Sequence, residues 1–169
     1  MEVKLGWVLL GNQVHVTDPC YTLGTWCAAW DLPVKPGIYE CSADIVDLPD
    51  WGARVASLQV LHREHEPVAD LVCEAYDIQI GVDSGQCGIF NPSSYRKLND
   101  MDAPDGYSAV CDATIAHRAA IFDNHGAVVS RTGYGDGGYT LYTYTDSNDD
   151  VVGLEILYLY EDYEDDWDD

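Results

Sequence analysis

The sequence predicts a mainly β fold: a single-domain antiparallel β-sandwich or open barrel with one or two short helices. Three observations predict it. Short segments rich in Val, Ile, Thr and Tyr alternate with polar residues, and this period of two is typical of strands. Clusters of Gly, Pro, Asp and Asn separate these segments, as turns do. The 47% apolar content, with twelve Tyr and five Trp, is enough for a packed core.

The first half of the chain contains the signals of four strands. Two apolar runs separated by Gly11-Asn12 predict a hairpin. Pro19 ends the second run, because it lacks an amide donor and pushes Asp18 toward extended backbone. Residues 25–30 are expected to form one helical turn, and residues 33–37 a turn. The expected strands are 3–10, 13–17, 38–46 and 54–62.

The second half contains further strands and one clear helix. Asn91 is a good N-cap and Pro92 suits the first helical position, so a short helix is expected over 92–98. Residues 107–117 fit both a helix, through apolar residues at i, i+3 and i+4, and a strand. A polar turn over 146–150 is expected to join the last two strands. The expected strands are 76–82, 86–90, 119–122, 127–131, 139–145 and 151–160.

Length and composition predict one soluble domain. At 169 residues the chain suits a single β-rich domain over 1–160, followed by an acidic, disordered tail over 161–169 whose negative charges repel one another. No run approaches the length of about 20 apolar residues that spans a membrane, and no secretory signal precedes the domain. The six cysteines form no C-x-x-C pair, so we expect reduced thiols and a cytoplasmic location.

The charge of the chain is strongly negative. Thirty Asp and Glu against eight Lys and Arg give a formal charge of −22. Direct binding to nucleic acid is disfavoured, because phosphates are normally neutralised by clustered Lys and Arg. Three interpretations of the acidity remain: solubility, mimicry of nucleic acid toward a basic partner, and electrostatic steering toward a cation.

Three aspartates stand out as possible site residues. Asp18, Asp83 and Asp136 each follow or end a predicted strand, and each lies near Gly or Pro. They either converge into one site or form local Asx turns that satisfy neighbouring amides. The segment 132–139 contains four glycines, which predict positive φ or a close approach of another segment.

For a nucleotide-like ligand, the amides of residues 135–138 are the expected anion contacts, with arginines as the scarce cations and aromatic rings as stacking surfaces. Trp7, Trp26, Trp30 and Trp51 either line such a pocket or belong to the core. No cofactor and no metal is expected. The predicted ligand-binding residues are Asp18, Cys20, Tyr21, Asp83, Tyr134, Gly135, Asp136, Gly137, Tyr139, Arg54 and Arg131.

A catalytic alternative is open. Cys20 would be a nucleophile with His15 as its base, giving a small hydrolase. A carboxylate-bound metal is the other hydrolytic possibility. The turn 146–150 has oxygen ligands at the first, third and fifth positions of a calcium loop, but Val151 and Leu157 stand where that loop needs Gly and Glu.

Three ordered motifs resemble a bacterial and phage domain family of unknown function, the 4241 type. They are Asp18-Pro19-Cys20-Tyr21, the run 81–90 that begins Gly-Val-Asp-Ser-Gly-Gln, and the run 133–139, Gly-Tyr-Gly-Asp-Gly-Gly-Tyr. The resemblance covers roughly residues 14–160. It implies a single β-rich domain and an accessory or counter-defence role in the host cytosol, and it implies no catalytic residues.

Together these features predict a non-enzymatic, phage-encoded counter-defence protein that sequesters a small nucleotide-like ligand or blocks a host protein. The alternatives are an acidic nucleic-acid mimic that inhibits a host nuclease or effector, and the small hydrolase described above. The expected partner is a small molecule or a host protein, with no nucleic acid bound directly and no membrane.

Overall fold

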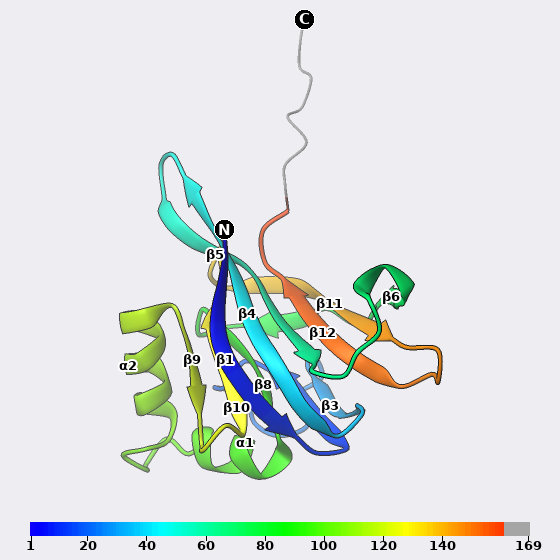
Figure 1. Cartoon of the computed structure of the whole chain (residues 1–169). Helices are drawn as coiled ribbons and strands as arrows, with labels where there is room; N and C mark the ends of the chain where they lie inside the picture. Colours follow the sequence, from blue (N-terminus) through cyan, green and yellow to red (C-terminus); the bar gives the residue numbers. More distant parts are fainter. Residues whose placement is uncertain (161–169) are drawn as a thin grey trace, which may run out of the picture.

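Two antiparallel sheets face each other across one apolar core in the computed structural model, which describes residues 1–160 (Figure 1). The predicted mainly β sandwich is therefore confirmed, and the described strands form two open sheets rather than a closed barrel. The acidic tail predicted over 161–169 lies outside the described residues. None of the helices within 1–160 has the length and apolar character needed to cross a membrane.

The larger sheet is built from strands that are far apart in the sequence. All its pairs are antiparallel, and β12, the last strand of the described residues, lies between β5 and β11. The short strand β7 (Ile80–Val82) pairs with the first residues of β11. The order across the sheet is β1 (Glu2–Leu10), β4 (Gly37–Leu48), β5 (Gly52–His62), β12 (Val151–Leu157), β11 (Gly137–Thr145) and β6 (Val72–Ala75).

The smaller sheet has five strands and is covered by both α-helices. Its order is β3 (Ala29–Pro33), β2 (Gln13–Thr17), β8 (Gln86–Phe90), β10 (Ala127–Arg131) and β9 (Ala119–Phe122). The helices α1 (Pro92–Leu98) and α2 (Tyr107–His117) pack on the face that points away from the larger sheet, and η1 (Val68–Asp70) precedes β6.

The central strands of the smaller sheet are buried on both faces. Every residue of β8 is buried, because alternate side chains point either to the core between the sheets or to the helices. Ile89 belongs to the core cluster between the sheets, whereas Phe90 packs with Tyr95 and Leu98 of α1 and with Val110 of α2. This double burial explains why β8 is apolar without alternation.

The predicted hairpin over residues 3–17 is wrong. β1 pairs with β4 in the larger sheet, and β2 pairs with β3 and β8 in the smaller one, so Gly11-Asn12 carries the chain from one sheet to the other. Asn91 holds this crossing: its Oδ1 accepts from the Gly11 amide at 2.9 Å and its Nδ2 donates to the Leu9 carbonyl at 2.7 Å. The Asn91 side chain therefore clamps the crossing and makes no capping bond to α1.

Three other segments differ from or sharpen the predictions. Residues 25–30 form no helix; they form a turn that leads into the edge strand β3. Of the strand predicted over 76–82, only residues 80–82 form a strand, β7, and the preceding strand β6 was not predicted. The ambiguous stretch 107–117 is the helix α2, whose buried residues Val110 and Thr114 face the smaller sheet.

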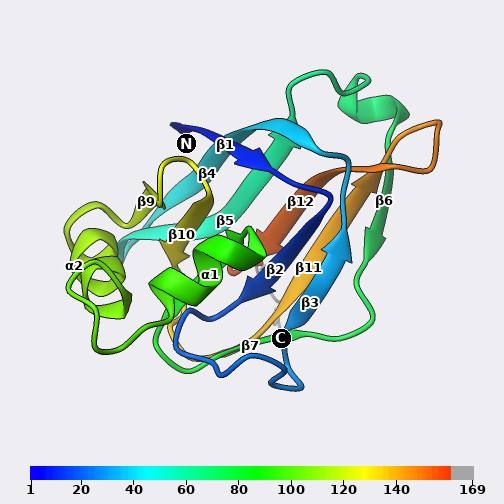
Figure 2. The same ribbon diagram turned by 90° about the horizontal axis from the view of Figure 1, so that it is seen from below.

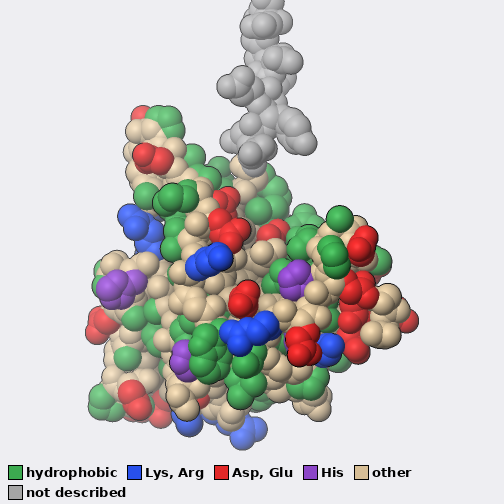
Figure 3. Space-filling model, in the orientation of Figure 1, with side chains coloured by type: hydrophobic (Ala, Val, Ile, Leu, Met, Phe, Trp, Pro, Cys, Tyr) green, Lys and Arg blue, Asp and Glu red, His purple; other side chains and the backbone are tan. Residues whose placement is uncertain are grey.

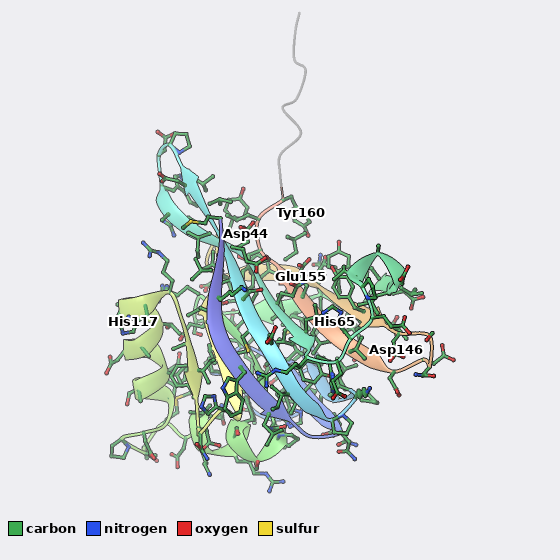
Figure 4. The ribbon with its side chains drawn as sticks, in the orientation of Figure 1. Asp44, His65, His117, Asp146, Glu155 and Tyr160 are labelled. Atoms are coloured by element: carbon green, nitrogen blue, oxygen red, sulfur yellow. The ribbon has the colours of Figure 1, made fainter. Side chains whose placement is uncertain are left out.

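The environment of Glu155 is expected to make the unfolding free energy depend on pH. This carboxyl lies half-buried on β12 and accepts from Gln59 Nε2 at 3.3 Å; Figure 4 labels it together with Asp44. Burial, with a smaller contribution from the Asp44 charge, raises the pKa of Glu155 in the folded protein. The folded state then binds more protons than the unfolded state between the ordinary and the raised pKa, so the unfolding free energy falls as pH rises through that window.

Removing this charge is therefore expected to stabilise the protein at neutral pH. Glu155→Gln should raise the urea midpoint at pH 7, and the gain should disappear below the ordinary pKa of glutamate. Glu74→Gln on the exposed strand β6 is the control and should change the urea midpoint little, as is usual for exposed positions. A gain of equal size at every pH would contradict the proposed cause.

Candidate functional site

The first two motifs are joined by one buried carboxylate. Asp18 is fully buried at the end of β2, and its two oxygens accept four hydrogen bonds. The amides of Asp83 and Ser84 donate to Oδ2 at 2.8 and 2.7 Å, while the Cys20 amide and the Ser84 hydroxyl donate to Oδ1 at 2.8 and 2.7 Å. Asp18 thus joins two turns that are more than sixty residues apart, and it has no free oxygen directed at a ligand.

The third motif joins them through a strand pair. Gly137 pairs with Val82 and Gly138 with Gly81 in the ladder between β11 and β7. Asp83 directly follows Val82 and Asp136 directly precedes Gly137, so the two aspartates flank the same end of this ladder. The three motifs therefore lie next to one another, but only Asp83 and Asp136 line the cleft between them, because the Asp18 carboxylate is bonded to turn amides.

The loop between β2 and β3 lies against β7 (Figure 2). The Gly81 amide donates to the Cys27 carbonyl at 2.7 Å. A Cβ at Gly81 would lie 2.5 Å from Cys27 Sγ and 3.0 Å from the Tyr21 hydroxyl, so only glycine allows this close approach.

A cleft of about 850 Å³ opens where these segments meet. Its volume lies within the range of roughly 300–1,000 Å³ that is usual for small-molecule sites. Tyr21, Trp26 and Ile78 provide aromatic and apolar surface, and Asp83 and Asp136 provide carboxylates. The other lining residues are Thr25, Cys27, Gln79, Gly81, Val82, Gly137 and Gly138.

The electrostatic character of the cleft is negative. Asp83 and Asp136 are exposed, no salt bridge within residues 1–160 includes either of them, and no Lys or Arg lines the cleft. Burial is the main cause that raises the pKa of Tyr21, with further contributions from Cys27 and the Asp83 charge. Tyr21 is therefore a neutral hydroxyl at physiological pH.

Several predicted ligand-binding residues lie elsewhere. Tyr134 packs edge-to-face on Trp51 with ring centroids 5.7 Å apart, and Arg54 lies over the same indole and donates to the Trp51 carbonyl at 3.2 Å. Tyr139 is buried and donates its hydroxyl to the Gly135 carbonyl at 2.7 Å. Tyr134 belongs to the loop after β10, Tyr139 to β11, and Arg54 to the start of β5 near the tip of the β4–β5 hairpin.

Two further predicted ligand-binding residues, Gly135 and Arg131, also lie outside the cleft lining. The Gly135 amide donates to the Thr132 carbonyl at 3.2 Å, so it is used within its own turn. Arg131 is half-buried and pairs with Gln86 at the end of the β8–β10 ladder. The predicted set therefore divides into cleft residues (Tyr21, Asp83, Asp136, Gly137) and residues that support the fold.

The Cys20 and His15 pair lacks the chemistry of a nucleophile and its base. Burial raises the pKa of Cys20 to about 12, aided by the neighbouring Asp18 carboxylate. His15 is buried between the rings of Trp30 and Tyr95, and its Nδ1 accepts from the Asp31 amide at 3.1 Å. Burial also lowers the pKa of His15, so the ring stays neutral with its proton on Nε2.

This arrangement predicts slow alkylation of Cys20. With a pKa of about 12, roughly one Cys20 thiol in ten thousand is ionised at pH 8, whereas Cys73 is exposed on β6. Iodoacetamide followed by peptide mass spectrometry should label Cys73 in the folded protein at least a hundredfold faster than Cys20, because the thiolate is the reacting species. Cys73→Ser should remove the fast phase, and equal labelling rates at the two cysteines would restore the catalytic alternative.

The acidic turn after β11 has a local structural role. Asp146 Oδ1 accepts from the amides of Asn148 and Asp150, both at 3.0 Å, which is an Asx-type turn. Within the described part of the chain, no group of three or more His, Cys, Asp or Glu side chains has the arrangement of a metal site.

Sequence reasoning missed part of the cleft lining. Ile78 and Gln79 line it, yet they lie in a segment whose pattern predicts only a strand. Gly138 belongs to the segment 135–138 whose amides were expected to contact a ligand, and Trp26, one of the four tryptophans considered for a pocket, is 84% exposed and lines the cleft. No family model matches the chain, and no curated protein and no solved structure matches it either.

Proposed function

We propose that this chain is a non-enzymatic binding protein that sequesters a small molecule in the cleft between the three motif turns. The observation that supports this most directly is the cleft itself, which combines an 84% exposed indole with lining glycines and two carboxylates that form no salt bridge within residues 1–160. A large aromatic ring left in water at a concave surface is typical of a binding site.

The chemistry of the cleft distinguishes between ligand classes. A nucleotide would bring its phosphates toward Asp83 and Asp136 without a lining Lys or Arg to neutralise them. We therefore favour a ligand that is neutral or positively charged and that stacks on Trp26. A counter-defence role, in which the bound molecule is withdrawn from a host pathway, is the biological setting that the family resemblance suggests.

The distribution of surface charge does not favour the alternative that the protein mimics nucleic acid. In Figure 3 Lys and Arg side chains lie among Asp and Glu over β1 and β4, so this face differs from a uniformly charged phosphate backbone. The acidity still keeps the protein soluble and steers cations toward it.

Binding is tested by thermal shift and calorimetry against a panel of anionic, neutral and cationic small molecules, nucleotides included. A ligand that binds only the folded state raises the melting temperature with concentration. Trp26→Ala should abolish the shift. Trp51→Ala is the matched control, since Trp51 is also an exposed tryptophan but lies at the β4–β5 hairpin, outside the cleft lining. Absence of any hit, or equal loss in both variants, would refute the proposal.

A further inference from the structure

The negative charges of the two cleft carboxylates, Asp83 and Asp136, repel each other. Asp83 follows Val82 and Asp136 precedes Gly137, the two residues that pair at the end of the β7–β11 ladder, and both aspartates line the same cleft. Like charges repel each other more strongly the closer they lie. Neither carboxylate is in a salt bridge with any residue of the described chain. A cation placed between them would relieve this repulsion.

The surroundings of these carboxylates fit an organic cation. Trp26, the aromatic type that binds cations best through its ring face, lies exposed in the same cleft. Ile78 adds apolar surface suited to an alkyl chain, and the neutral Tyr21 hydroxyl adds a hydrogen-bonding group. A planar cation with several N–H donors satisfies both requirements, since it stacks on an indole and donates paired hydrogen bonds to carboxylates.

We infer that the cleft recognises a guanidinium group, stacked on Trp26 and held by Asp83 and Asp136. This inference rests on the proposed binding function and specifies its ligand class. The guanidinium belongs either to a free small molecule or to an arginine side chain of a peptide. Both sources present the same planar head group.

The test uses n-butylguanidinium and its neutral isostere n-butylurea, measured by calorimetry with the full chain. The guanidinium compound should bind at least tenfold more tightly than the urea, and its affinity should fall as salt is raised. Asp83→Asn and Asp136→Asn should each weaken guanidinium binding at least fivefold and leave urea binding unchanged. Asp112→Asn, on the exposed side of α2, is the control and should have no effect.

A second pair of probes distinguishes the two sources. The peptide acetyl-Gly-Arg-Gly-amide is compared with the same peptide carrying citrulline, whose urea head is neutral. Tighter binding of the peptide than of n-butylguanidinium assigns the site to an arginine side chain, and the reverse order assigns it to a free molecule.

The outcomes separate this inference from the proposed function. Equal binding of the guanidinium and urea compounds, or Trp26-dependent binding of a nucleotide instead, would overturn the guanidinium assignment and leave a binding cleft in place. Failure of every compound in the panel to bind would overturn both.

Discussion

Asp18→Ala is expected to lower the free energy of unfolding by about 3–5 kcal/mol, the cost usual for removing one partner of a buried charged interaction. The fully buried carboxylate is the common acceptor for three backbone amides and one hydroxyl. Without it, the amides of Cys20, Asp83 and Ser84 lose their acceptor at a site that water reaches poorly. The two turns that form one side of the cleft should then separate.

Urea unfolding followed by tryptophan fluorescence measures this loss. Asp18→Asn is a milder companion variant: it keeps one acceptor oxygen and turns an amide NH2 toward N–H donors, so it should also destabilise by about 2 kcal/mol or more. Asp112→Asn should change stability by less than about 0.5 kcal/mol, as is usual for exposed positions. If Asp18→Asn were as stable as the unsubstituted protein, the joining role of Asp18 would be wrong.

Gly133→Ala is expected to destabilise the protein by about 2–4 kcal/mol, which is typical of overpacking against atoms that cannot move freely. A Cβ at this position would lie 2.6 Å from the Val55 carbonyl oxygen and 2.5 Å from Leu159 Cγ. The carbonyl belongs to the backbone of β5, so relief of the contact requires a shift of the main chain.

Gly135→Ala in the same motif provides the matched comparison. Its φ is +82°, but a Cβ there would meet no atom of residues 1–160 within 4 Å. The expected cost is therefore only the backbone strain of about 1 kcal/mol. Thermal unfolding of both variants should show the larger loss for Gly133→Ala. The reverse order would mean that conformation, rather than close packing, explains the glycines of this motif.

Local patterns predicted the elements whose partners are close in sequence. The strands over 139–145 and 151–160 alternate clearly and are joined by a turn with its own Asx hydrogen bonds, so the pairing of β11 with β12 was predictable. The helix α1 was also predictable from local signals, Asn91 and Pro92. The Asn91 side chain, however, accepts from the Gly11 amide and makes no capping bond.

Long-range pairing explains the errors. Gly11-Asn12 is a good turn signal whether the chain returns along the same sheet or crosses to the other one, and only contacts with Asn91 and with β8 decide this. β6 was missed because its four residues are all exposed and show no alternation of burial. The sequence alone could not decide whether the three motifs lie together, since Asp side chains in turns form local hydrogen bonds as readily as distant ones.

The position of β12 has a consequence for the order of assembly. It is the last described strand, yet it lies between β5 and β11 and pairs with both. During synthesis from the N-terminus, the larger sheet therefore exists as two separate parts, β1-β4-β5 and β11-β6, until residues 151–157 become available. Both inner edges present unpaired amides and carbonyls in that interval, which favours association with other chains. We therefore expect the nascent protein to be most prone to aggregation just before β12 is inserted.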